Sequence, residues 1–113
     1  MLEGLKVVEY ATYIAAPGAG GVLADWGAAV IKIEPPGGDP IRQFFASVGI
    51  EGVALNPVFE LDNRGKRGIV LDTGQAAGRD ALLKLADGAD VLDRKSTRLN
   101  SSHIQKSRMP SSA

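Results

Sequence analysis

Two segments of the chain have residue types that could bind a phosphate-bearing ligand. Gly18-Ala-Gly20-Gly21 is a glycine-rich turn that opens an apolar helical pattern, and Asn63-Arg-Gly-Lys-Arg67 is a basic turn that leads into an apolar run. Backbone N–H groups at a helix N-terminus favour anions, and Lys and Arg side chains neutralise phosphate charge. A nucleotide-like cofactor is therefore the first ligand to consider, although a basic surface turn is usually only solvated.

The glycine-rich segment is a poor match to the dinucleotide-binding fingerprint G-x-G-x-x-G. The third glycine of that pattern would fall at Leu23, and the first lies eight residues beyond Tyr10 instead of directly after a strand. Glycines that let a helix pack closely on a sheet are the favoured interpretation of Gly20, Gly21 and Gly27. A fragment of a nicotinamide-dependent oxidoreductase stays as an alternative.

Carboxylates in the first 92 residues could serve acid–base or nucleophilic chemistry, but their spacing marks none as a base or a nucleophile. Each is therefore expected to have an ordinary structural role. The carboxylates considered are Glu9, Asp25, Glu34, Asp39, Asp62 and Asp72. The chain has no cysteine and its single histidine is His103. Residues 1–92 thus cannot supply a Ser-His-Asp triad, a thiolate nucleophile or a Cys/His metal site, and no metal is expected.

The elements expected to position these residues alternate between strand and helix. Strands are predicted at residues 5–10, 29–34, 67–72 and 89–92. Helices are predicted at residues 18–27, 41–46 and 75–86, with a loop over 11–17. This order is typical of an α/β fold built from βαβ units, with a mostly parallel sheet that is truncated after the fourth strand. Open sheets of this kind bind ligands at the carboxyl ends of their strands, where residues 71–74 would lie.

The composition changes abruptly after Leu92. Residues 1–92 hold 8 Lys/Arg and 12 Asp/Glu, whereas residues 93–113 hold 5 and 1, so the overall net charge of zero is a cancellation. A basic Ser/Arg-rich tail usually suggests an arm for nucleic acid. Residues 93–113, however, back-translate to a common sequencing adapter. We expect this segment to be a non-native, disordered tail, with a small binding module carrying a genuine basic tail as the alternative.

Several classes of protein are excluded by what residues 1–92 lack. There is no run of 18 apolar residues that could span a membrane. The N-terminus has no basic region followed by an apolar core, the pattern of a secretory signal peptide. The absence of cysteine fits a reducing compartment. We therefore expect a cytoplasmic protein that binds neither membrane nor nucleic acid.

Residues 2–92 resemble the N-terminal part of class III coenzyme A (CoA) transferases. This group includes formyl-CoA transferase-like and carnitine CoA-transferase-like enzymes and the related α-methylacyl-CoA racemases. The resemblance is carried by Leu2-Glu-Gly-Leu-Lys-Val-Val-Glu9, the Ala-Pro-Gly turn at 16–18, residues 23–42, Asn63-Arg-Gly-Lys-Arg67, Leu71-Asp72 and Ala89-Asp-Val-Leu92. It implies a Rossmann-like CoA-binding domain over residues 1–92, an interlocked homodimer, and transfer of CoA from an acyl-CoA to a free carboxylic acid.

The resemblance also implies which residues contact CoA. The contacts expected by position are Ile14, Ala15, Leu71, Asp72, Thr73 and Gly74. Some relatives carry basic residues where this chain has Pro35 and Gly74, so Arg42, Arg64 or Lys66 would have to neutralise the CoA phosphates.

No catalytic residue is expected within the chain itself. The family's nucleophilic aspartate, which forms an acyl anhydride and then an aspartyl-CoA thioester, lies beyond position 92. The chain alone is therefore expected to be inactive, and to fold poorly because a truncated sheet leaves an open edge. Transferase and racemase cannot be distinguished from these residues.

Overall fold

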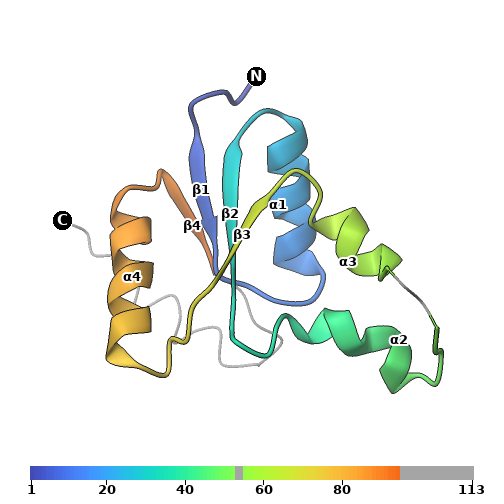
Figure 1. Cartoon of the computed structure of the whole chain (residues 1–113). Helices are drawn as coiled ribbons and strands as arrows, with labels where there is room; N and C mark the ends of the chain where they lie inside the picture. Colours follow the sequence, from blue (N-terminus) through green and yellow to red (C-terminus); the bar gives the residue numbers. More distant parts are fainter. Residues whose placement is uncertain (53–54, 95–113) are drawn as a thin grey trace.

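A four-stranded, all-parallel sheet forms the centre of the computed structural model, which describes residues 1–52 and 55–94. The strands are β1 (Lys6–Glu9), β2 (Ala29–Glu34), β3 (Arg67–Val70) and β4 (Val91–Asp93), in the spatial order β3-β2-β1-β4 (Figure 1). The predicted α/β fold with a parallel sheet is confirmed. The expected disordered tail lies outside the described residues, apart from Asp93, which ends β4, and Arg94.

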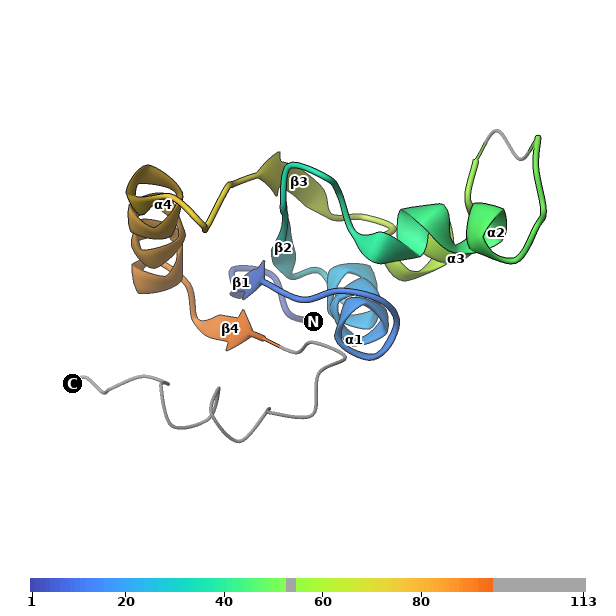
Figure 2. The ribbon, with the colours of Figure 1, turned by 90° about the horizontal axis from the view of Figure 1, so that it is seen from below.

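Two helices lie on opposite sides of this sheet, α1 (Ala15–Asp25) between β1 and β2, and α4 (Ala76–Asp87) between β3 and β4 (Figure 2). The strand order explains this arrangement. The step from β1 to β2 and the step from β3 to β4 run in opposite directions across the sheet, so right-handed crossovers place their helices on opposite faces.

Helix α1 begins three residues earlier than predicted. The sequence indicated a loop through Pro17, but α1 starts at Ala15 and includes Pro17 in its first turn. Proline is tolerated there because N–H groups of the first turn have no partner within the helix. Ile14 is the N-cap residue, and no side chain caps this end of α1.

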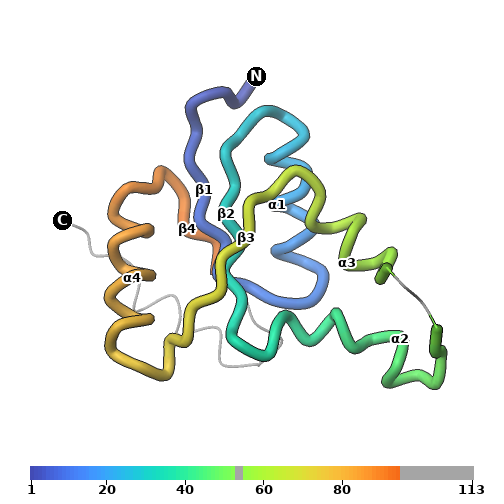
Figure 3. Tube along the Cα trace, viewed as in Figure 1, coloured from blue at the N-terminus to red at the C-terminus, as the bar shows by residue number. Residues whose placement is uncertain are grey.

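The long segment between β2 and β3 projects beyond α1, as the Cα trace shows (Figure 3). The helix predicted at residues 41–46 is divided between η1 (Pro40–Gln43) and α2 (Phe44–Ser47). A further helix, α3 (Pro57–Asp62), was not predicted and packs against α1. The Asn56 side chain accepts hydrogen bonds from the N–H groups of Val58 and Phe59, which explains why α3 begins where it does.

The apolar core is small and lies between α1 and the sheet. Val7, Ala28 and Val30 are buried together, and Leu2, Leu5, Leu23 and Ala24 pack against them. On the other side of the sheet, α4 has no buried residue. Within residues 1–52 and 55–94, no helix combines the length and the apolar character needed to cross a bilayer.

Candidate functional site

The loops that follow β1 and β3 meet at the carboxyl edge of the sheet. The Tyr10 hydroxyl, directly after β1, lies 2.7 Å from the Thr73 hydroxyl in the turn between β3 and α4. Ile14 and Ala15 follow in the first of these loops, where Ile14 is 57% exposed at the start of α1. The structure therefore brings the two segments predicted to contact CoA to one edge of the sheet.

The turn after β3 is held by hydrogen bonds that its backbone N–H groups donate. The Leu71 N–H donates to the Glu34 carbonyl at 3.0 Å, and the Asp72 carboxylate accepts the Gly74 N–H at 3.0 Å. Gly78 of α4 allows the helix to approach this turn, since a Cβ there would lie 1.9 Å from the Asp72 carbonyl oxygen. Because that neighbour is backbone, any side chain at this position would displace the turn.

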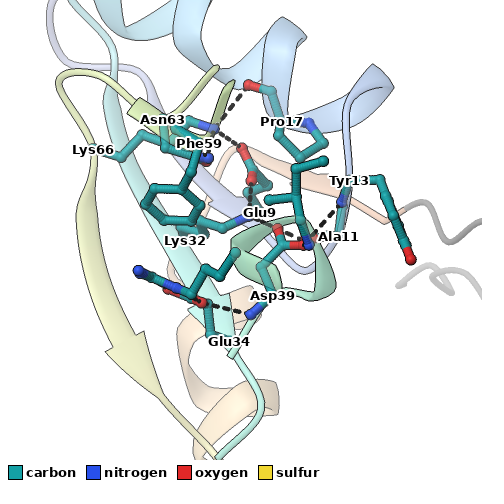
Figure 4. A network of polar contacts seen from close by, with 12 residues as sticks. Glu9, Ala11, Tyr13, Pro17, Lys32, Glu34, Asp39, Phe59, Asn63 and Lys66 are labelled. Atoms are coloured by element: carbon teal, nitrogen blue, oxygen red, sulfur yellow. Dashed lines mark hydrogen bonds and ion pairs between the residues drawn. The ribbon is translucent and has the colours of Figure 1, made fainter. Parts of the chain in front are cut away.

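A buried ion-pair cluster lies beneath the loop after β1 (Figure 4). It comprises Glu9, Lys32, Asp39 and Lys66, and we call it the four-charge cluster. Glu9 of β1 and Lys32 of β2 are register partners, their side chains are 0% and 2% exposed, and Glu9 Oε2 lies 3.0 Å from Lys32 Nζ. Lys32 Nζ also contacts Asp39 Oδ2 at 2.9 Å and donates to the Ala11 carbonyl at 3.3 Å. Lys32 Nζ therefore donates two hydrogen bonds, to Glu9 and to the Ala11 carbonyl, and makes an ion-pair contact with Asp39.

Lys66 completes the cluster from the turn before β3. Its ammonium lies 2.7 Å from Glu9 Oε1 and donates to the Pro17 carbonyl at 2.8 Å and to the Asn63 side chain at 2.7 Å. Burial lowers the pKa of Lys66 from its ordinary value, and the Glu9 carboxylate opposes that shift. Two lysines and two carboxylates thus balance in charge, which is the condition under which buried ions are tolerated.

Asp39 connects the four-charge cluster to the loop after β1. Its Oδ1 accepts hydrogen bonds from the backbone N–H groups of Tyr13 at 3.1 Å and Ile41 at 3.0 Å. Tyr13 has φ of 69°, and among the described residues other than glycine it alone has a positive φ. A tyrosine in this left-handed region is uncommon and costs conformational energy, so its surroundings must hold it there.

Glu34 and Arg42 form a second ion pair at the end of β2. Arg42 donates two hydrogen bonds to the Glu34 carboxylate, at 2.7 and 2.8 Å, and its guanidinium carbon lies 3.8 Å from the centre of the Phe59 ring. The Asp39 N–H also donates to Glu34 at 2.7 Å. The hydrogen bonds from Arg42, aided by that from the Asp39 N–H, hold the pKa of Glu34 below its ordinary value, and burial opposes this shift.

This ion pair makes the stability of the chain sensitive to acid. The pKa of Glu34 is lower in the folded state than its ordinary 4.5, so on acidification the unfolded chain takes up a proton first. The stabilisation of the folded state by the Glu34–Arg42 ion pair is therefore lost as the pH falls below about 4.5. The Arg42 side chain is 46% exposed, so we expect the ion pair to contribute only about 0.5–1 kcal/mol to the free energy of unfolding at pH 7. Urea unfolding at pH 7 and pH 3.5 should show Arg42→Gln losing less stability on acidification than the parent. Arg67→Gln, at an exposed position of β3, should behave as the parent does, and identical acid responses in all three proteins would contradict the prediction.

The basic residues considered for the CoA phosphates are all paired with acids. Arg64 donates to the Asp25 carboxylate at 2.7–3.1 Å. The Lys66 side chain is 2% exposed and bound to Glu9, so it is withdrawn from that role by burial. Arg42 retains exposed surface beside Glu34. Within Asn63-Arg-Gly-Lys-Arg67, Lys66 therefore points inward, unlike the residues of a basic turn that is only solvated.

The four-charge cluster was missed when each carboxylate was judged by its spacing alone. The spacing of Glu9 and Asp39 predicts only ordinary structural roles for them, and the apolar neighbours of Lys32 predict only a strand. A signal was nevertheless present, because a lysine inside the otherwise apolar run at residues 30–33 requires a buried acid as partner. The register that pairs Glu9 with Lys32 was needed to identify that acid.

Comparison with known proteins gives the family. Residues 2–98 match the profile of CoA-transferase family III, so the match runs past residue 92 into the segment that resembles adapter sequence. The chain is 45% identical over 94 residues to (R)-2-hydroxy-4-methylpentanoate CoA-transferase of Clostridioides difficile. It is 44% identical over 96 residues to cinnamoyl-CoA:phenyllactate CoA-transferase of Clostridium sporogenes. These alignments cover 80% and 81% of this chain.

A solved structure agrees with the sequence relatives. The fold is similar to that of a CAIB/BAIF family protein from Brucella suis, with a TM-score of 0.77 and 37% identity, over 96% of this chain and 29% of that chain. The chain spans 23% of the length of each of the two sequence relatives. A profile match over most of the chain, together with these relatives, shows that the chain belongs to family III of the CoA-transferases.

Proposed function

We propose that residues 1–92 form the N-terminal, CoA-binding part of an acyl-CoA:carboxylate CoA-transferase. In this proposal Ile14 and Ala15 after β1, and the turn at residues 71–74 after β3, contact CoA. The observation that carries the proposal is the hydrogen bond between Tyr10 and Thr73, which joins these two loops at one edge of the sheet. The names of the two sequence relatives favour CoA transfer over racemisation.

The strand order supports the same location. In β3-β2-β1-β4 the direction of the crossovers reverses between β1 and β4, and open α/β sheets of the Rossmann type bind ligands at such a switch point, beyond the carboxyl ends of the strands. The N-terminus of α1 lies at that edge and has no side-chain cap. Its free N–H groups and helix dipole would favour a phosphate or another anionic group.

In this proposal residues 1–92 bind CoA, and the covalent chemistry depends on residues beyond them. In the proposed reaction an acyl-CoA and a free carboxylic acid exchange CoA: the donor acyl group is released as a free acid, the acceptor acid becomes the new acyl-CoA, and an enzyme aspartate beyond residue 92 carries the covalent intermediates. Residues 1–92 bind and orient CoA, and supply no nucleophile. We therefore infer that the 113-residue chain alone has no turnover, and that the complete enzyme is a cytoplasmic homodimer.

Calorimetric titration tests the binding role. CoA is expected to bind the 113-residue chain at least about tenfold more tightly than NAD, a difference of about 1.4 kcal/mol. Gly78→Ala should weaken CoA binding because its Cβ displaces the Asp72 carbonyl. Gly88→Ala, whose Cβ would make only ordinary contacts of 3.9–4.0 Å, is the matched control in the same part of the chain.

Two results would overturn the proposal. One is tighter binding of NAD than of CoA, which would favour the nicotinamide alternative. The other is unchanged CoA affinity in Gly78→Ala, which would separate binding from the turn after β3. If the isolated chain lacks a cooperative fold, the same titrations apply to the C. difficile relative with residues 2–92 of this chain in place of its aligned segment.

A further inference from the structure

We propose that Asp39, held by Lys32, is a positioning residue that fixes the loop after β1 in the conformation that presents Ile14 and Ala15 to CoA. The inference rests on the proposed function for its binding consequence. Its structural part, that one buried carboxylate sets the conformation of Tyr13, stands on the contacts alone. Asp39 itself lies after β2 and does not belong to the predicted CoA contacts.

The first argument is that both ends of a tripeptide are tied to the same ion pair. Lys32 Nζ donates to the carbonyl of Ala11 at 3.3 Å, and the N–H of Tyr13 donates to Asp39 Oδ1 at 3.1 Å. Lys32 Nζ and Asp39 Oδ2 are themselves 2.9 Å apart. Residues 11–13 are therefore held against one rigid pair, directly before the start of α1 (Figure 4).

The second argument is the backbone conformation that these contacts hold. Tyr13 has φ of 69°, which a residue with a Cβ rarely adopts without support. Relaxation of Tyr13 to a negative φ would redirect the chain at the next residue, Ile14. The hydrogen bond to Asp39 opposes that relaxation, so the position of Ile14 depends on a residue 25 positions later in the sequence.

The third argument is that Asp39 has no freedom of its own. It is 1% exposed, its N–H donates to Glu34 Oε2 at 2.7 Å, and its Oδ1 also accepts the N–H of Ile41 at 3.0 Å. Its Oδ2 contacts Lys32 Nζ. The side chain is thus held by two hydrogen bonds at Oδ1 and by an ion-pair contact at Oδ2, and the loop after β2 sets the loop after β1.

Two substitutions separate the positioning role from general stability. Asp39→Asn and Asp39→Ala both remove the charge that compensates Lys32, but only asparagine keeps an oxygen that can accept the Tyr13 N–H. With that oxygen in place the asparagine NH2 group faces the Lys32 ammonium, where alanine has no polar group. Amide hydrogen exchange followed by NMR reads the loop directly. In Asp39→Ala we expect the Tyr13 amide to exchange at least about tenfold faster relative to the β-sheet amides of Val8 and Ile31, and in Asp39→Asn to stay close to the parent.

Binding provides the second readout. CoA affinity should fall about tenfold or more in Asp39→Ala, because the competent loop becomes a minor conformation, and much less in Asp39→Asn. Adding Tyr13→Gly to Asp39→Ala should recover part of the affinity, since glycine adopts positive φ without support. If the parent binds no CoA, the proposed function fails, while the exchange data still decide whether Asp39 holds Tyr13.

Equal exchange of the Tyr13 amide in the two Asp39 variants overturns the inference. If either single variant loses protection throughout the sheet, both are compared again with Lys32→Met added. In that background one positive and one negative charge are removed together, so no buried ion is left uncompensated. The difference at the Tyr13 amide between the chain with Asp39→Asn and the chain with Asp39→Ala then decides the outcome.

Discussion

Replacement of Lys32 by methionine is expected to unfold the chain or bring it close to unfolding. Lys32 Nζ is the shared partner of Glu9 and Asp39, at 3.0 and 2.9 Å, and both carboxylates are fully buried. Without Lys32, Asp39 loses the cation that its carboxylate contacts, and Glu9 keeps only Lys66. Removal of one partner from a buried ion pair costs about 3–5 kcal/mol, while a domain of roughly 100 residues has only about 5–15 kcal/mol of stability in total.

Urea unfolding followed by circular dichroism measures this effect. Lys84→Met is the matched control, because Lys84 lies exposed in α4 and the same chemical change there should alter the free energy of unfolding by less than about 0.5 kcal/mol. A Lys32→Met chain that unfolds at the same urea concentration as the parent would show that the four-charge cluster contributes no net stability.

Gly20→Ala is expected to be the second most damaging change. A Cβ on Gly20 would lie 2.1 Å from Glu9 Oε1 and 3.1 Å from Lys66 Nζ, so the substitution must displace a buried carboxylate from its partner. Loss of that pair costs about 3–5 kcal/mol, against about 1 kcal/mol that alanine gains over glycine inside a helix. We expect a net loss of about 2–4 kcal/mol.

Gly18→Ala in the same helix is the control for Gly20→Ala. A Cβ on Gly18 would make only an ordinary contact of 3.7 Å with Asp62 Oδ1. The helix preference then dominates, and Gly18→Ala should be neutral or stabilising by up to about 1 kcal/mol. Thermal unfolding of the two variants beside the parent makes the comparison. Similar melting temperatures for the two variants would show that Gly20 is not needed for close packing on Glu9.

The fold was predictable wherever the local sequence carries the information. All four predicted strands are present, because short apolar runs bounded by glycine, proline or charged residues are typical of buried parallel strands. β2 has its predicted bounds, and the ends of the other three strands differ from the prediction by at most two residues. Helix α1 begins before its predicted start because proline, which usually marks a loop, is also tolerated in the first turn of a helix. Helix α3 was overlooked although Asn56-Pro57 is a recognisable start, since its six residues are too few to show a helical period.

The candidate site was predictable only in part. The resemblance places the CoA contacts on the loops after β1 and β3, and the structure brings these loops together, while the contacts themselves stay a prediction. The partners of the charged residues were not predictable. Lys66 lies 57 positions from Glu9 in the sequence, and their contact depends on the strand register and on the packing of α3 against α1. Such contacts follow from the tertiary fold, and no local pattern records them.

The electrical neutrality of the four buried side chains has a consequence for protein engineering and for sequence evolution. Reversal or loss of any single member leaves a surplus ion in the interior, whereas loss of one lysine together with one carboxylate does not. Viable sequences are thus separated by two simultaneous changes, with a poorly folded intermediate between them. A library that varies one position at a time would find these sites immutable, while one that varies them as opposite pairs would reach new solutions.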